Sequence, residues 1–222
     1  MPATLDRYLP QVAAFNLLVV AVALMALGRI ATARPLKDLP DGVQNAAEAV
    51  LDWFVEQARR IHAPSVRLIA PFLATLFLLI LLANLLVLLP VPLLGIPPTS
   101  YYSVPFGLAL VAVLGGLVIV ARIRGVRATL KHLFWPNPLQ LVSEVSHTLS
   151  LSLRLYGIVG GEFIVATLVM QAVPYGIPLV VHGLGLIPLS IQPIVFTLLT
   201  ANTLATALHA EEKATPRRRR SA

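Results

Sequence analysis

The sequence predicts an all-α integral membrane protein, and two features of its composition carry this prediction. The chain of 222 residues is 57% hydrophobic and only 12% charged, whereas ordinary soluble domains carry about 25% charged residues. The apolar residues are also gathered into runs, several of which reach the roughly 20 residues that a helix needs to cross a bilayer. We therefore expect residues 1–222 to form a single membrane domain with about five membrane-embedded helices.

The first apolar run covers residues 8–28. A cleaved signal peptide is an alternative, because the "ATA" that follows the run resembles a small-residue cleavage site. The segment before the run, however, holds both Asp6 and Arg7 and so has no net positive charge. The cations come after the run, at Arg29, Arg34 and Lys37. This distribution favours a retained helix whose N-terminus lies outside the cell.

Residues 41–63 predict an amphipathic helix that lies at the membrane interface, because the segment is too charged to cross lipid. Asp41 can cap its start. The apolar face repeats at helical spacing and consists of Val43, Ala47, Val50, Phe54, Ala58 and Ile61. Another face carries Glu48, Asp52, Glu56 and Arg60.

The middle of the chain predicts two further spans. Residues 68–90 form one of them, with Asn84 as its only amide side chain. A proline-rich, uncharged loop leads from there to the next span, residues 104–121. Four cations follow that span, at Arg122, Arg124, Arg127 and Lys131.

The last two predicted helices, 138–173 and 180–209, contain many polar residues. The first is about 35 residues long, more than an upright span requires, so we expect it to be strongly tilted or bent. One of its faces, set by steps of three or four residues, carries Ser143, His147, Ser150, Arg154 and Gly161. Glu144 lies in the same segment, and the last helix bears Gln192 and Asn202.

Charge in the loops predicts the orientation of the spans. Cations are frequent in 29–67 and 122–131 and absent from 91–103 and 172–185, and the tail 213–222 is basic again. Cytoplasmic loops carry an excess of Lys and Arg, so five spans with the N-terminus outside and the C-terminus in the cytoplasm satisfy every loop. The terminal arginines could instead indicate nucleic-acid binding, but beside membrane spans we interpret them as cytoplasmic charge and expect no nucleic-acid partner.

Arg154 is the strongest functional candidate, because a permanent cation within an apolar helix is costly in lipid and usually marks function. Gly157 and Gly161 lie on the same face and would let another helix approach closely. Such a face suits a partner whose carboxylate loses its proton on approach. The alternative is a salt bridge to Glu144 or Glu162, although Glu162 lies about 12 Å further along the same helix, too far for an intrahelical pair.

Several classes of site are excluded by the sequence itself. There are no cysteines, and the five histidines show no metal-ligand spacing such as HExxH. No GxxxxGK[ST] motif is present, so the sequence shows no P-loop for binding a nucleotide. We expect no cofactor, no metal and no catalytic activity from this chain alone.

The stretch "SLSLRLYGIVGGE", residues 150–162, resembles the signature of subunit a, the stator ion channel of bacterial F-type rotary ATP synthases. Members of that family typically have serine-leucine in this stretch, followed by arginine-leucine-phenylalanine-glycine-asparagine and then by glycine-glutamate. Three further segments agree in order: "PFLATLFLLILLANLLVLLP", "PPTSYYSVPFGLAL" and "SIQPIVFTLLTANTLATALHAEE". The resemblance covers residues from about 40 to 212.

The resemblance implies a role for each matched residue. Arg154 would be the essential arginine that faces the ring of c subunits, with Gln192 beside it on the last helix. Glu162 would line the aqueous half-channel on the outer side, while the two long helices wrap along the rotor. Other possible channel-lining residues are Glu144, His147, His182 and Asn202, and the small rotor-facing residues are Gly157 and Gly161. The partners would be the c-ring, the b subunits of the peripheral stalk and the catalytic head, in a bacterial inner membrane.

The chain departs from the family pattern at positions that affect the outer proton route. Ile158 replaces the usual asparagine, while Tyr101 and Ser103 stand where an aspartate or asparagine is frequent. Gly185 stands where the last helix often has a titratable residue, and His182 is the nearest candidate.

Two other functions compete with an ion channel. A secondary transporter would use Arg154 to bind an anionic substrate, but the sequence lacks the internal repeat of many transporters. A purely structural membrane subunit would leave Arg154 and Glu162 unexplained.

Overall fold

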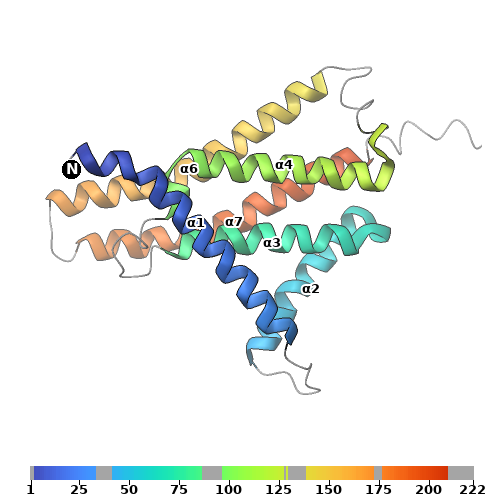
Figure 1. The fold of residues 1–222 in the computed structure, drawn as a ribbon, viewed down its shortest axis with the longest axis horizontal. Coiled ribbons are helices and arrows are strands. Elements are labelled where there is room, and N and C mark those ends of the chain that lie inside the picture. The colour runs from blue at the N-terminus through green and yellow to red at the C-terminus, as the bar shows by residue number, and fades with distance from the viewer. Residues whose placement is uncertain are drawn as a thin grey trace, which may run out of the picture. The chain divides into compact units, whose positions relative to one another are not determined.

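The computed structural model describes residues 3–33, 42–86, 97–127, 129, 139–172 and 177–209. These residues form helices (Figure 1), and no strand occurs in this part of the chain. The long helices are α1 (Ala3–Ala33), α2 (Gly42–His62), α3 (Val66–Leu85), α4 (Ser103–Arg124), α6 (Leu139–Ala172) and α7 (Ile177–His209). Two short 3-10 turns are η1 (Ala63–Ser65) and η3 (Pro98–Ser100). The all-α prediction is confirmed.

Five helical stretches within the described ranges are long and apolar enough to cross a membrane, as predicted. They are Gln11–Arg29, Glu48–Leu85, Ser103–Arg124, Val142–Ala166 and Gly183–His209. The second stretch includes much of α2, because the chain continues helically through η1 into α3. The predicted end of the second span, after Leu86, and the predicted cap at Asp41 lie outside the described residues.

The chain divides into two compact units, which we describe separately. The first unit comprises Met1–Pro35, Phe77–Leu110 and His147–Phe196. The second comprises Leu36–Leu76, Val111–Ser146 and Thr197–Ala222.

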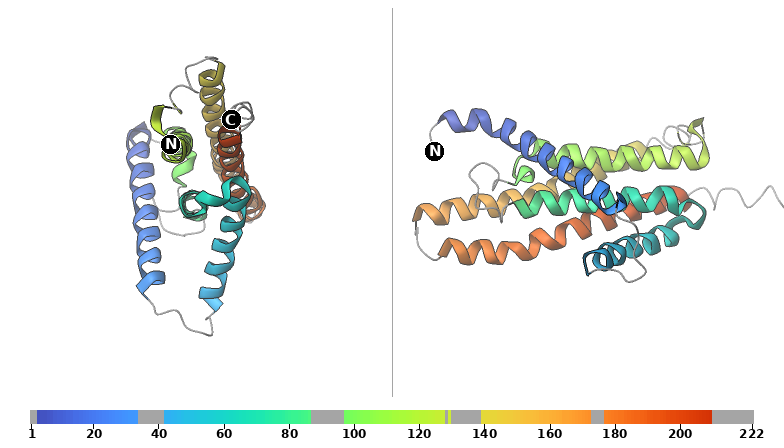
Figure 2. Two further views of the ribbon diagram at one scale, coloured as in Figure 1. Left: turned by 90° about the vertical axis from the view of Figure 1, so that its right-hand side faces the viewer. Right: turned by 60° about the horizontal axis from the view of Figure 1, so that its bottom comes forward.

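In the first unit, α1 packs against the end of α3 and against η3. Val20 of α1 is buried with Ala83 of α3 and with Leu86, which directly follows α3, and α1 also contacts η3. The later part of α6 and the earlier part of α7 run side by side in this unit (Figures 1 and 2). This pairing brings residues near the middle of both helices together.

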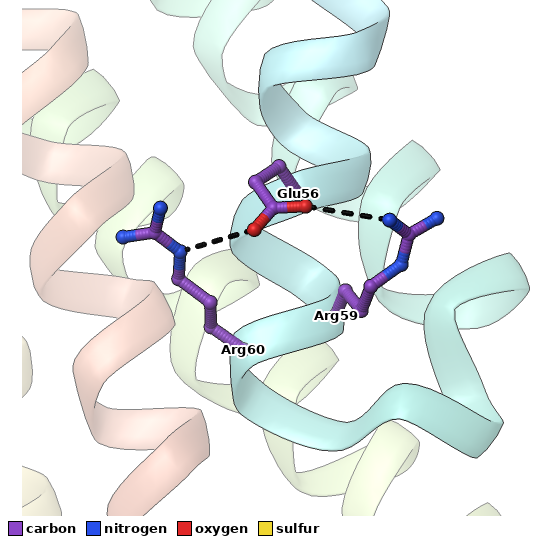
Figure 3. A network of polar contacts seen from close by, with 3 residues as sticks. All are labelled: Glu56, Arg59 and Arg60. Carbon is purple, nitrogen blue, oxygen red and sulfur yellow. Dashed lines mark hydrogen bonds and ion pairs between the residues drawn. The ribbon is translucent and has the colours of Figure 1, made fainter.

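In the second unit, α2 has the two faces that its sequence pattern predicts. Its buried face includes Phe54, Ala58 and Ile61. On the exposed face, the Glu56 carboxylate forms ion pairs of 3.4 Å with both Arg59 and Arg60 (Figure 3). α2 is therefore amphipathic, as predicted, and its bounds differ from the expected 41–63 by one residue at each end. Its position at the membrane interface stays a prediction.

The ends of α4 and α7 are also joined within the second unit. Arg124 Nη1, in the last turn of α4, donates a 3.0 Å hydrogen bond to the Ala207 carbonyl in the last turn of α7. The final carbonyls of a helix have no intrahelical donor, and a cation there is favoured by the helix dipole. The C-terminal ends of α4 and α7 thus lie together.

Candidate functional site

Arg154 lies on the exposed side of α6 in the first unit. Its guanidinium forms no ion pair or hydrogen bond with any residue that the structure describes. The salt bridge to Glu162 or Glu144, which was the alternative interpretation of this arginine, is therefore not formed among the described residues. Leu153, beside it on α6, is an exposed apolar residue, so the cation lies on a largely apolar surface.

Arg154 and Gln192 line the same shallow cavity between α6 and α7, with a volume of about 500 Å³. The remaining lining residues are apolar: Ile158, Ile187, Pro188, Ile191 and Val195. The two polar side chains come from the consecutive helices α6 and α7, and the packing of α6 beside α7 brings them together. Ile158, the departure from the family pattern, contributes an apolar wall here.

Gln192 is only 2% exposed, and its Nε2 atom has no hydrogen-bond partner among the described residues. A buried amide without a partner generally costs about 1–3 kcal/mol. Such groups are rare in folded proteins and call for an explanation. Within the described part of the chain, an amide donor without a partner thus lies beside an arginine without a partner, and together they offer the polar groups that a carboxylate would need.

Gly157 and Gly161 leave open space on the surface of α6. A Cβ atom added at either position would meet nothing within 4 Å outside the local backbone. Gly160, between them, differs because a Cβ there would lie 3.0 Å from the Tyr156 ring and 3.5 Å from the Ser100 carbonyl. The two glycines on the predicted face are therefore not required by packing within this chain.

Glu162 lies against Gly185 in the first unit. A Cβ atom on Gly185 would overlap the carboxylate of Glu162, so α7 must lack a side chain at this position for Glu162 to occupy it. The Oε2 atom of Glu162 is buried and has no hydrogen-bond partner among the described residues. The absence of a side chain at Gly185 thus leaves the space that the Glu162 carboxylate occupies.

Asn84 connects α3, η3 and α7 through two hydrogen bonds. Its Nδ2 donates to the Leu189 carbonyl at 3.1 Å, and its Oδ1 accepts a bond of 2.9 Å from Thr99 Oγ1. Both polar residues are 0% exposed. In the sequence Asn84 stands out only as the lone amide of its span, and the pattern does not indicate its partners. Pro193, four residues after Leu189, is the signal that could have found them.

Tyr102 fixes the start of α4 against α6. Its hydroxyl lies 3.3 Å from Ser152 Oγ, and its ring packs edge-on against Tyr156 with a centroid distance of 5.6 Å. Tyr101 and Ser103, the departures flanking it, do not line the cavity that contains Arg154.

The other predicted channel-lining residues fall in different places. His147 is half-buried on α6 in the first unit, whereas Glu144 and Asn202 belong to the second unit. His182 lies in α7, but its side chain is outside those that the structure describes. Within the described ranges, no group of three His, Asp or Glu side chains comes together as a metal site would require.

Comparison with known proteins gives a consistent result over most of the chain. The family model described as ATP synthase A chain matches residues 14–204. ATP synthase subunit a of Moorella thermoacetica is 32% identical over 199 residues, covering 87% of this chain and 89% of the relative. The protein of the same name from Trichlorobacter lovleyi is 33% identical over 189 residues, covering 81% and 80%. ATP synthase subunit a 1 of Syntrophotalea carbinolica is 35% identical over 185 residues, covering 79% and 76%. The chain therefore belongs to the ATP synthase A chain family.

Proposed function

We propose that this multi-pass membrane subunit of ATP synthase is the stator ion channel of the complex. In this proposal it provides two aqueous half-channels and an essential arginine, which exchange protons with the carboxylates of a rotating c-ring. Ion flow is thereby coupled to ATP synthesis or hydrolysis. The observation that carries the proposal is the exposed Arg154, which has no ion pair in the described part of the chain and shares a cavity with Gln192.

The exposure of Arg154 argues for an acidic partner outside this chain. An arginine at the centre of a membrane helix raises the free energy of inserting that helix into the bilayer by about 2.5–3.5 kcal/mol. Such residues usually face a partner or a water-filled cavity. The open surface at Gly157 and Gly161 supports the same conclusion, because small residues let a second helix approach closely. A ring of helices that carry carboxylates would meet both conditions.

Other residues receive proposed roles around this centre. Gln192, with its unpaired amide, would contact the same rotor carboxylate as Arg154. Glu162 would exchange protons in the outer half-channel. Glu144, His147, His182 and Asn202 remain possible channel-lining residues.

Ion translocation and ATP chemistry would be carried out by different subunits of the complex. This chain would translocate ions without catalysing a reaction by itself, and ATP chemistry would occur in the catalytic head. Its partners would be the c-ring and the b subunits of the peripheral stalk. The complex would lie in a bacterial inner membrane, with the N-terminus of this chain outside.

If the rotor approaches this face closely, Gly161→Leu should severely impair proton pumping. The substitution should be tolerated by the chain itself, because a Cβ atom there meets open space. It should nevertheless abolish ATP-driven proton pumping in inverted vesicles, while the c-ring still co-purifies. The matched control is Gly107→Leu on α4, where an added Cβ atom also meets nothing within 4 Å. Normal pumping by the Gly161 variant would contradict the close approach of a ring to this face.

The orientation predicts which sites are accessible to impermeant thiol reagents. The chain has no cysteine, so single cysteines in the tail 213–222, in 122–131 and near Tyr101 give unambiguous labels. The first two sites should react only from the cytoplasmic side and the third only from outside. The bond between Arg124 and Ala207 supports a common side for the first two, because it joins the ends of α4 and α7. Labelling of the tail from outside would refute the five-span arrangement.

A further inference from the structure

Pro193 removes one backbone hydrogen bond from the middle of α7. In an α-helix each carbonyl accepts a bond from the N–H group four residues later, and proline has no N–H group. The Leu189 carbonyl therefore lacks its usual donor. Leu189 is only 2% exposed, so this carbonyl needs a partner from elsewhere in the protein.

Asn84 supplies the missing donor from another helix. Its Nδ2 lies 3.1 Å from the Leu189 carbonyl oxygen, and Thr99 Oγ1 donates to its Oδ1 at 2.9 Å. The Leu189 carbonyl fixes the orientation of the amide, because the opposite orientation would place two acceptors against each other there, and the Thr99 hydroxyl then donates to the remaining Oδ1. Asn84, Thr99 and Leu189 all belong to the first unit, which also contains Arg154 and Gln192.

We propose that Asn84 and Thr99 form a clamp that replaces the backbone bond lost at Pro193 and thereby positions Gln192 beside Arg154. A proline inside a helix weakens the local backbone hydrogen bonding and lets the helix bend there. Gln192 immediately precedes Pro193, so the local backbone geometry at this point bears directly on where its side chain points. The Nε2 atom of Gln192 has no partner among the described residues. The backbone of α7, rather than a hydrogen bond to that atom, therefore determines where the amide lies. Asn84 and Thr99 are positioning residues.

Pro188 provides a contrast within the same helix. It also lies inside α7, and the carbonyl that loses its donor belongs to Leu184. Leu184 is 64% exposed, and no described side chain donates a hydrogen bond to it. The clamp is therefore specific to Pro193, the proline beside Gln192.

The first readout is cross-linking, which does not depend on ion transport. Ile158→Cys and Val195→Cys place two thiols around the cavity that contains Arg154, in a chain without other cysteines. We expect Asn84→Leu to change the rate of disulfide formation by about tenfold, as the loss of one buried hydrogen bond implies. In a Pro193→Ala background, which restores the N–H group, Asn84→Leu should have little effect. In a Pro188→Ala background its full effect should persist.

A second pair of variants tests the other half of the clamp. Thr99→Val is isosteric and removes the hydroxyl, so it should alter cross-linking in the same direction as Asn84→Leu. Thr99→Ser keeps the hydroxyl and should behave like the parent chain. Unchanged cross-linking in Asn84→Leu, or an equal change with and without Pro193, would overturn the clamp.

The effect on transport rests on the proposed function and is measured separately, as ATP-driven acidification by the whole complex in inverted vesicles. Asn84→Leu should slow acidification by about tenfold while the complex stays assembled, and Thr99→Ser should leave the rate unchanged. Unaltered acidification by Asn84→Leu, despite altered cross-linking, would overturn the positioning role of the clamp. Normal acidification by Arg154→Ala would instead remove the proposed function and leave the cross-linking result standing.

Discussion

Replacement of Arg154 by alanine is expected to abolish ATP-driven proton pumping and ATP synthesis without loss of assembly. Breaking a buried ion pair typically costs about 3–5 kcal/mol, because it leaves the partner charge uncompensated. Arg154 has no such partner among the described residues and lies on the exposed side of α6. Its removal should therefore leave the fold of this chain intact, and the loss should appear in transport alone.

The physical reason for the expected loss is the permanent charge of arginine. An arginine beside a carboxyl group generally lowers the pKa of that carboxyl by about 1 to 3, and each pKa unit corresponds to about 1.4 kcal/mol. A rotor carboxylate that passes Arg154 would thus release its proton into the exit half-channel. The same charge repels a cation that would cross directly between the half-channels, so the alanine variant is also expected to leak ions passively.

Lysine should not substitute for arginine at this position. A lysine can lose its charge when it is buried, whereas arginine stays protonated, so Arg154→Lys is also expected to fail in coupled transport. The measurement is ATP-driven acidification of inverted vesicles, with assembly checked by co-purification of the ring. Arg59→Ala is the control, because Arg59 is an exposed arginine on α2 whose pair with Glu56 is a surface interaction of small energetic value. Near-normal acidification by Arg154→Ala would overturn the proposed mechanism.

The helices could be predicted from the sequence because apolar runs and helical spacing are local signals. The two long polar segments expected at 138–173 and 180–209 correspond to α6, Leu139–Ala172, and α7, Ile177–His209. The apolar run expected at 8–28 lies within α1, Ala3–Ala33, whose membrane-capable part is Gln11–Arg29. The apolar run indicates only the part of a helix that contacts lipid. The backbone hydrogen bonds of the helix continue into its polar ends, so the helix is longer than the run.

The site required information that is not local. Arg154 could be singled out from its chemistry, but its proximity to Gln192 depends on how α6 packs beside α7, and only the resemblance suggested it. The family pattern marks Gly185 as the loss of a titratable group, whereas in the structure the Glu162 carboxylate occupies the space beside it. The hydrogen bond from Asn84 to the Leu189 carbonyl forms because a proline leaves that carbonyl without its helical donor. The spacing of apolar residues in the sequence gives no information about such a bond.

Replacement of Glu162 by glutamine is the second change for which we expect a large loss. Glutamine has nearly the same shape, so it should fit against Gly185 as the carboxylate does. It cannot bind and release a proton, however, and general acid–base groups at such positions contribute about 10²–10⁴-fold to rates. We expect ATP-driven acidification to fall severely in Glu162→Gln, with the ring still co-purifying.

Two further variants of Glu162 test whether transport requires a group that exchanges protons or only a polar side chain. Glu162→Asp and Glu162→His both retain a group that titrates, so each should keep part of the pumping activity that Glu162→Gln loses. Glu56→Gln is the matched control, because Glu56 is an exposed carboxylate whose partners are Arg59 and Arg60 on the surface of α2 (Figure 3). Its loss should leave acidification unchanged. The two carboxylates differ in that Glu162 Oε2 has no hydrogen-bond partner among the described residues, whereas Glu56 is held in ion pairs and is less free to exchange its proton. Full acidification by Glu162→Gln would make Glu162 a structural polar group that packs on Gly185, and the outer half-channel would then need another relay.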